Sequence, residues 1–209
     1  MNIIDHYKWR YATKKFDAKK KISDSNIELI KESISLAPTS YGLQLFKVII
    51  IEKKEIKDEL KKASFNQSQI SDASHIFVFC NSTKIVENDI DAYIKNKAAI
   101  QNKTISEISG YGDFLKDTLL RKDHTKISTW TTNQVYIALS HLMTFCPSLD
   151  IDSCPIEGFE SNKYNEILKL NNRNLNSTVV AAVGYRSNTD LSQYEKKIRK
   201  SNDELFETI

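Results

Sequence analysis

Short apolar runs rich in β-branched residues, separated by segments of helical periodicity, constrain the fold of this chain more than any other feature. The clearest runs are residues 46–51, 75–80 and 178–183, with a shorter one at 151–154. Their length and their content of Val, Ile and Phe predict buried strands. Between them, apolar residues recur every three or four positions, the pattern of an amphipathic helix. Strands that alternate with helices predict a sheet covered by helices on both faces, with the strand directions left open.

Capping and helix-breaking residues mark several helix boundaries. Ser23 is a good N-cap for a helix that Pro38 would end, because proline disrupts a helix beyond its first turn. Residues 83–120 also look largely helical, but their weak amphipathicity predicts an excursion packed outside the main sheet. The remaining expected helices are 3–9, 55–63, 125–145 and 164–170. The longest of these carries apolar residues on several faces, which suits burial on more than one side.

Composition favours one globular domain. The 209 residues, of which 40% are hydrophobic and 27% charged, fit a single domain spanning residues 1–209. The net charge of +3 comes from lysines scattered among acids, which is typical of solvated helix faces and not of a nucleic-acid-binding stripe. The apolar runs are too short to span a bilayer, and the N-terminus lacks a signal-peptide pattern. Three cysteines without C-x-x-C spacing favour reduced thiols and a cytoplasmic location.

Several motifs that would define other functions are missing. The five glycines do not form G-x-G-x-x-G, so a Rossmann dinucleotide site is not expected. Neither a Walker A motif nor the G-x-S-x-G turn of many hydrolases occurs. The four histidines show no metal-ligand spacing, so no metal site is predicted.

Cations at the two ends of the chain are the first candidates for binding chemistry. Arg10 and Lys14 lie near the start, and Lys197 and Arg199 near the end. If the polar C-terminal segment folds back, these four side chains would form a phosphate clamp, with arginine supplying a planar fork and lysine a point charge. On the residues alone, ordinary solvated charges remain the alternative.

The segment Cys154–Phe159 is the second candidate. Pro155 fixes its own φ angle, and Gly158 frees the backbone after an acidic residue. We expect a turn here that presents backbone N–H groups to a ligand at close range.

Taken together, R-Y-A-T-K at 10–14, P-I-E-G-F at 155–159 and K-I-R at 197–199 resemble the FMN-dependent nitroreductase family. The similarity is closest to the oxygen-insensitive NAD(P)H nitroreductase and dihydropteridine reductase branch, and it extends from Ile3 to about Phe206. It implies an α+β fold with a mixed sheet sandwiched by helices. It also implies an intertwined homodimer with FMN at the interface, in which helix 125–145 resembles the family's central dimer helix.

This resemblance implies roles for particular residues. The cations at 10, 14, 197 and 199 would grip the FMN phosphate. Ala12 stands where the family usually has Ser or Thr, so the phosphate would rely more on backbone N–H groups and on the cations. No catalytic side chain is implied beyond the flavin itself, apart from Lys14 as an electrostatic stabiliser. The implied cofactor-binding residues are Arg10, Tyr11, Ala12, Lys14, Pro38, Thr39, Ser40, Gly42, Asn66, Gln69, Pro155, Ile156, Glu157, Gly158, Lys197 and Arg199.

Some of these residues would meet particular parts of the flavin. The segment 38–40 would line the flavin, while Gly42 replaces a frequent Asn and could cost one hydrogen bond. Asn66 would meet the ribityl chain or ring edge, and Gln69 the pyrimidine end of the ring. The backbone N–H groups of 157 and 158 would reach the flavin N5 region, where hydride arrives.

The implied activity is that of an FMN-dependent NAD(P)H oxidoreductase. It would take electrons from NADH or NADPH and reduce nitroaromatics, quinones or similar small acceptors by ping-pong two-electron transfer. The open alternatives are a dihydropteridine or free-flavin reductase, a low-turnover flavin-binding redox sensor, and a basic interaction module without a cofactor.

Overall fold

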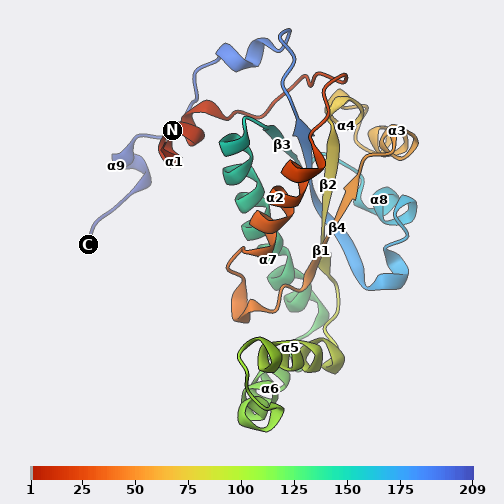
Figure 1. Ribbon diagram of the computed structural model, residues 1–209, viewed down its shortest axis with the longest axis vertical. Helices are drawn as coiled ribbons and strands as arrows, with labels where there is room; N and C mark the ends of the chain where they lie inside the picture. The colour runs from red at the N-terminus through yellow and green to blue at the C-terminus, as the bar shows by residue number, and fades with distance from the viewer. Residues whose placement is uncertain (1) are drawn as a thin grey trace.

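The computed structural model describes residues 2–209 (Figure 1). Its strands are β1 (Phe46–Ile51), β2 (His75–Ser82), β3 (Asp152–Ile156) and β4 (Leu175–Gly184). Its helices are α1 (Ile3–Trp9), α2 (Asp24–Ser35), α3 (Lys54–Lys62), α4 (Ser68–Asp72), α5 (Glu87–Ile100), α6 (Ile105–Leu119), α7 (His124–Phe145), α8 (Ser161–Ile167) and α9 (Asn202–Leu205). Among residues 2–209, no helix is both long and apolar enough to cross a membrane. The strands and long helices expected from the sequence are present with shifted ends, whereas α4 and α9 were not expected.

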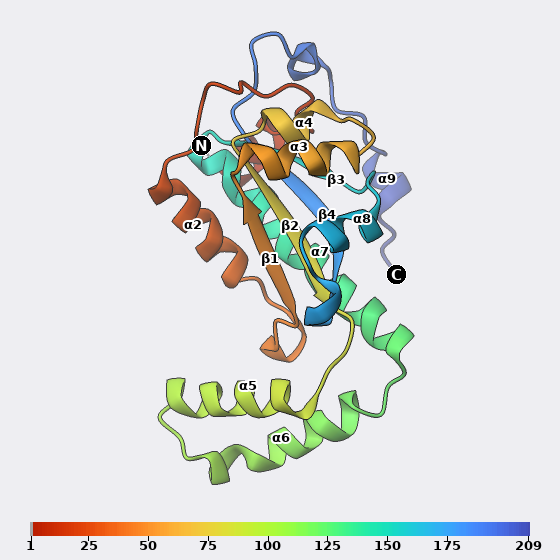
Figure 2. The same cartoon turned by 90° about the vertical axis from the view of Figure 1, so that its right-hand side faces the viewer.

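The four strands form one sheet in the order β1-β2-β4-β3. Every pairing within residues 2–209 is antiparallel, so the α+β class is confirmed but the sheet of one chain is not the mixed sheet that the resemblance implied. The antiparallel pairing of β1 and β2 follows from the connection between them. Figures 1 and 2 place α3 and α4 at the end of the sheet where β1 ends and β2 begins, so the chain turns back instead of crossing the sheet.

Both faces of the sheet are covered by helices, as the alternation of strands and helices predicts. Successive side chains of a strand point to opposite faces, and β2 shows this clearly. Phe77 and Phe79 enter a core with α2 and α7, whereas Ile76 and Val78 enter a second core with α3, α4 and α8. Burial of apolar surface on both sides is the main source of stability for such a sheet. It also fixes α7 against one face.

The segment 83–120 forms the excursion that the sequence predicts. Helices α5 and α6 extend beyond the end of the sheet (Figure 2) and bury a separate apolar cluster that includes Ile90, Ile94 and Leu115. Because this cluster also contains Ile127 and Leu45, the excursion is anchored to the start of α7 and to the residue before β1.

The third strand differs from the expectation. It covers Asp152–Ile156, so Pro155 and Ile156 belong to the sheet and not to a turn. Pro155 pairs with Ala181 of β4 at the edge of the sheet. An edge strand tolerates proline because its missing N–H can face away from the ladder. The turn therefore begins only at Glu157.

Candidate functional site

A cavity of about 390 Å³ lies where the two ends of the chain meet. Five of its lining side chains are cationic, and Glu195 is the only carboxylate among the lining residues that the structure describes. Seven of the residues implied by the sequence take part in the lining. The lining residues are Arg10, Tyr11, Ala12, Lys14, Met143, Pro155, Ser192, Glu195, Lys196, Lys197 and Arg199.

The charge distribution of this cavity fits an anion. Burial, and to a lesser degree the charge of Arg199, lowers the pKa of Arg10. Burial followed by the charges of Arg10 and Arg199 likewise lowers the pKa of Lys197. The Nε atom of Arg10 is buried and has no hydrogen-bond partner within residues 2–209. A buried donor without a partner costs free energy, and a phosphate would supply both the missing acceptor and the missing negative charge.

The C-terminal segment reaches the cavity by folding back onto α1. The Lys197 Nζ atom donates to the backbone oxygen of Lys8 at 2.5 Å, close to the end of that helix. The start of this helix is fixed by a capping box, in which the Asn2 side chain accepts from the Ile4 and Asp5 N–H groups. Because Lys197 binds Lys8, residues from the first and last parts of the chain line the cavity together.

A buried ion pair lies against the loop that follows α1. Asp152, at the start of β3, binds Arg186 through two oxygens, with a closest distance of 2.6 Å between Arg186 Nη2 and Asp152 Oδ1. The guanidinium of Arg186 lies 4.0 Å from the ring centre of Trp9 and 4.7 Å from that of Tyr11. Stacking of this kind is favourable for arginine. It fixes the loop that follows α1.

Asp190 fixes the same loop from a second direction. Its carboxylate accepts hydrogen bonds from the backbone N–H groups of Lys14 and Lys15, at 2.8 and 3.0 Å. These two N–H groups are thus already bonded within the protein. These two N–H groups are therefore not free to compensate for Ala12, and the side-chain cations are the main donors left for an anion.

A second group of predicted residues gathers at the end of β3. The Gln67 Nε2 atom donates to the Gly158 oxygen at 2.7 Å, which places the segment containing Asn66 and Gln69 beside Glu157 and Gly158. Asn66 adopts a left-handed φ of 59°, a conformation that asparagine tolerates better than most residues. Ile156 is buried at the end of β3.

Helix α7 links the two groups. The Tyr136 hydroxyl donates to Glu157 Oε1 at 2.6 Å, and Met143 lines the cation cavity. Residues seven positions apart on a helix point within about 20° of each other. One face of α7 therefore runs from Glu157 to the cavity.

The third group, Pro38 to Gly42, lies elsewhere. The Ser40 N–H donates to Gln134 Oε1 at 2.8 Å, and residues two positions apart on a helix, such as Gln134 and Tyr136, point about 200° apart. Ser40 and Glu157 are thus on opposite sides of α7. The described residues that line the cation cavity include none from 38–42, so one chain does not bring Pro38, Thr39, Ser40 and Gly42 to the other predicted residues.

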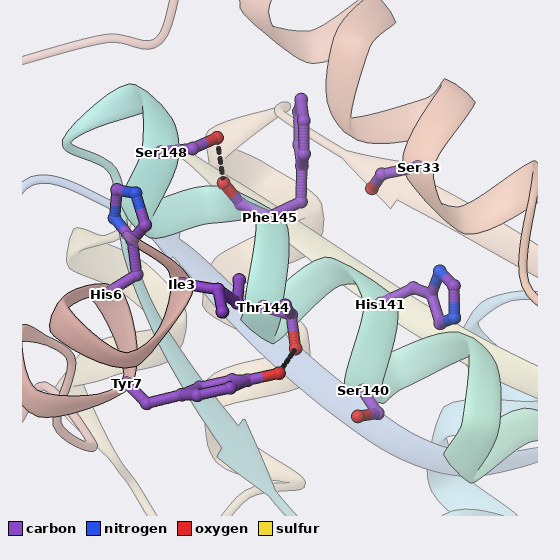
Figure 3. Close-up of a pocket in the computed structure, with 9 residues that line it drawn as sticks. All are labelled: Ile3, His6, Tyr7, Ser33, Ser140, His141, Thr144, Phe145 and Ser148. Carbon is purple, nitrogen blue, oxygen red and sulfur yellow. Dashed lines mark hydrogen bonds between the residues drawn. The ribbon is translucent and has the colours of Figure 1, made fainter. Parts of the chain in front are cut away.

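A larger cavity, of about 560 Å³, offers different chemistry (Figure 3). It lies between α1, α2 and α7, and its polar groups are mainly hydroxyls and the imidazoles of His6 and His141. Tyr7 and Thr144 form a hydrogen bond across it at 3.3 Å. Its described lining contains no lysine, no arginine and no residue implied by the sequence. It therefore lacks a counter-charge for phosphate, and the smaller cavity is the better candidate.

Sequence reasoning missed the acids and the tyrosine that organise the site. Asp152 accepts from the Thr13 hydroxyl, Asp190 from the Lys14 N–H, and Glu157 from the Tyr136 hydroxyl, so each holds a segment that carries predicted residues. The only signals in the sequence are indirect. Asp190 opens the polar C-terminal stretch, and Tyr136 lies on the long helix.

The fold and the cavity define an α+β protein with a cation-lined cavity built from both ends of the chain. The chain belongs to the nitroreductase family, since the family model described as "Nitroreductase family" matches residues 7–185. A Staphylococcus saprophyticus protein named "Putative NAD(P)H nitroreductase" is 35% identical over 219 residues, covering 99% of this chain and 96% of the relative. The Bacillus subtilis protein YfkO, which carries the same description, is 33% identical over 196 residues, covering 88% of each chain.

Solved structures show the same fold. A nitroreductase family protein from Streptococcus pneumoniae has a TM-score of 0.85 at 21% identity, covering all of both chains (100% each). A "putative nitroreductase in complex with FMN" from Exiguobacterium sibiricum has a TM-score of 0.86 at 18% identity, covering 100% of this chain and 98% of the other. At these identities the likeness concerns the fold alone.

Proposed function

We propose that this protein is an FMN-dependent NAD(P)H oxidoreductase that passes two electrons from NADH or NADPH to small acceptors such as nitroaromatics and quinones. The observation that carries the proposal is the cation-lined cavity with the buried, unpartnered Nε of Arg10 within residues 2–209. Family membership and the names of the relatives support the activity. The FMN complex of a protein with the same fold supports the cofactor.

The residues of the chain would hold FMN in two parts. Arg10, Lys197 and Arg199 would bind its phosphate through charge-assisted hydrogen bonds. Glu157 and Gly158, held by Tyr136 and Gln67, would offer their backbone N–H groups to the flavin ring. When bound, FMN would supply the hydride chemistry.

Electrostatics would be the main catalytic contribution of the protein. The side chain of Lys14 brings a positive charge to the cavity, which would favour negative charge that develops there. Desolvation, followed by the bond to Glu157, raises the pKa of Tyr136 to about 12, so this hydroxyl stays protonated and keeps orienting Glu157 at neutral pH.

Activity and absorbance test the proposal together. We expect the purified protein to absorb at about 450 nm, as oxidised flavins do, and to consume NADH or NADPH when menadione or nitrofurazone is added. Initial rates should give parallel double-reciprocal lines, the pattern of a ping-pong reaction.

Other outcomes would select the alternatives. Turnover confined to dihydropteridine or free flavins would identify a reductase of that kind, and bound FMN without turnover would identify a redox sensor. A protein that binds no flavin even when FMN is added would contradict the proposal and leave an interaction module.

We also propose that the site is completed in a homodimer. The segment 38–42 lies on the side of α7 opposite to Glu157, so a second copy would have to supply it to the flavin. The C-terminal segment extends away from the sheet and ends beyond α9 in Figure 1. It exposes many large apolar side chains. These are Leu191, Tyr194, Ile198, Leu205, Phe206 and Ile209. Exposed apolar side chains in such number are typical of a surface that another molecule covers.

Light scattering is expected to give a mass twice that of the 24.0 kDa chain at micromolar concentration, with two FMN per dimer. Dilution should release FMN and dissociate the dimer together, because the site would need both copies. A monomer that retains FMN would contradict this assembly.

A further inference from the structure

A buried carboxylate lies directly behind the cation cavity and joins the two ends of the chain. The side chain of Asp190 belongs to a residue that is only 2% exposed. Its Oδ2 atom accepts hydrogen bonds from the Tyr11 hydroxyl at 2.9 Å and from the N–H groups of Lys14 and Lys15 at 2.8 and 3.0 Å. Its Oδ1 atom accepts from the Ser192 N–H at 3.2 Å. We call these four bonds the Asp190 knot.

The knot holds a segment that no regular structure holds. Residues 10–15 belong to neither a helix nor a strand, yet they carry two cations of the cavity, Arg10 and Lys14. The bond from Ser192 caps the short turn Leu191–Tyr194, which starts the segment that leads to Lys197 and Arg199, so Asp190 joins this turn to the loop. Fixing loop residues in one conformation costs conformational entropy, and the knot meets that cost before any ligand binds.

The charge state of the knot suits this role. Burial would raise the pKa of Asp190, but the hydrogen bonds from Lys15, Lys14 and Tyr11 outweigh burial and lower it. Two contacts fix the Tyr11 side chain: its hydroxyl donates to Asp190, and its ring lies against the guanidinium of Arg186. Tyr11 also lines the cavity.

We propose that Asp190 is a positioning residue that sets the arrangement of the phosphate-binding cations, and that it thereby gives FMN its advantage over riboflavin. This inference rests on the proposed function. Asp190 touches no part of the cofactor in this role, because it does not line the cavity and both of its oxygens accept from the protein's own donors. Its effect passes through the position of the loop.

Positioning and simple electrostatics predict opposite results for Asp190→Asn. Removing a negative charge near five cations would strengthen the binding of an anion by Coulomb's law. An amide, however, has one acceptor oxygen and no charge, so its NH2 group faces at least one of the N–H or O–H donors of the knot. The knot then loses one hydrogen bond and the charge assistance of the others, and the loop is held less firmly. The knot therefore predicts weaker FMN binding in spite of the more positive site.

The test is a fluorescence titration of the flavin-free protein with FMN and, separately, with riboflavin. We expect Asp190→Asn to weaken FMN binding about tenfold, the effect of roughly one lost hydrogen bond to a charged group, with riboflavin affinity within about twofold. Tyr11→Phe, which removes one donor without changing the charge, should weaken FMN binding in the same sense by a smaller factor. Asp113→Asn removes the same charge from the exposed surface of α6 and should change neither affinity.

The outcomes distinguish failure of the proposed function from failure of the role of the knot. If the unaltered protein binds neither flavin, the proposed function fails, and the role of the knot fails with it. If it binds FMN and Asp190→Asn binds FMN equally or more tightly, the knot alone is overturned. Equal losses for FMN and riboflavin would show that Asp190 only maintains the fold, which also overturns its role in phosphate recognition.

Discussion

Asp152→Ala is expected to lower the free energy of unfolding by about 3–5 kcal/mol, the range for removing one partner of a buried ion pair. The side chain of Asp152 is 3% exposed and that of Arg186 is 19% exposed. The carboxylate accepts from both the guanidinium and the backbone N–H of Arg186. Its removal leaves a largely desolvated cation between Trp9 and Tyr11 without a counter-charge.

A matched control lies on the surface of the same protein. Asp117 and Arg121 form a pair with a similar separation, 2.7 Å, but their side chains are 70% and 77% exposed. Asp117→Ala should therefore cost no more than about 0.5 kcal/mol. Urea unfolding of the two flavin-free variants measures the difference. Equal losses, or a loss below about 1 kcal/mol for Asp152→Ala, would mean that the buried pair is not held as the geometry indicates.

Arg199→Ala is expected to weaken FMN binding ten- to a hundredfold. The variant loses a charge-assisted hydrogen bond to phosphate, a contribution of roughly 1.5–3 kcal/mol. Arg199 lines the cation cavity, and its Nη1 atom donates only to the neighbouring Ile198 oxygen among the residues described. Titration of the flavin-free protein measures the change.

Two comparisons make this measurement specific. Lys200 is exposed and lies outside the described lining of the cavity, so Lys200→Ala should leave FMN affinity nearly unchanged. Riboflavin lacks the phosphate and should bind both variants alike. An Arg199→Ala protein with unaltered FMN affinity would remove this residue from the clamp.

The core of the fold was predictable because burial leaves a clear pattern. The run 75–80 is continuous and apolar, and in the structure its residues alternate between two cores. The end of β3 was not predictable from the same rule. Pro155 and Gly158 are both turn formers in isolation, and only the pairing of Pro155 with Ala181 shows that the strand continues.

The residues of the candidate site were likewise predicted only in part. The cations were found through the resemblance, since a family pattern links positions that lie far apart in the sequence. The acids behind them were not found, because a buried Asp and a solvated Asp look alike in a polar stretch such as residues 187–193. Their role depends on partners at a sequence distance of 34 for Asp152 and Arg186 and of 179 for Tyr11 and Asp190.

The meeting of the chain ends has a consequence for the order of biosynthesis. The bond from Lys197 to Lys8 closes a loop of 189 positions. The ribosome therefore adds Lys197 189 residues after Lys8. The nascent chain can build most of the sheet while the clamp is still incomplete. Under the proposed function, a tight grip on the FMN phosphate would arise only after Lys197 and Arg199 have left the ribosome, so cofactor loading would follow synthesis of the whole sheet. A protease that removes these two residues would abolish the grip while leaving the sheet in place.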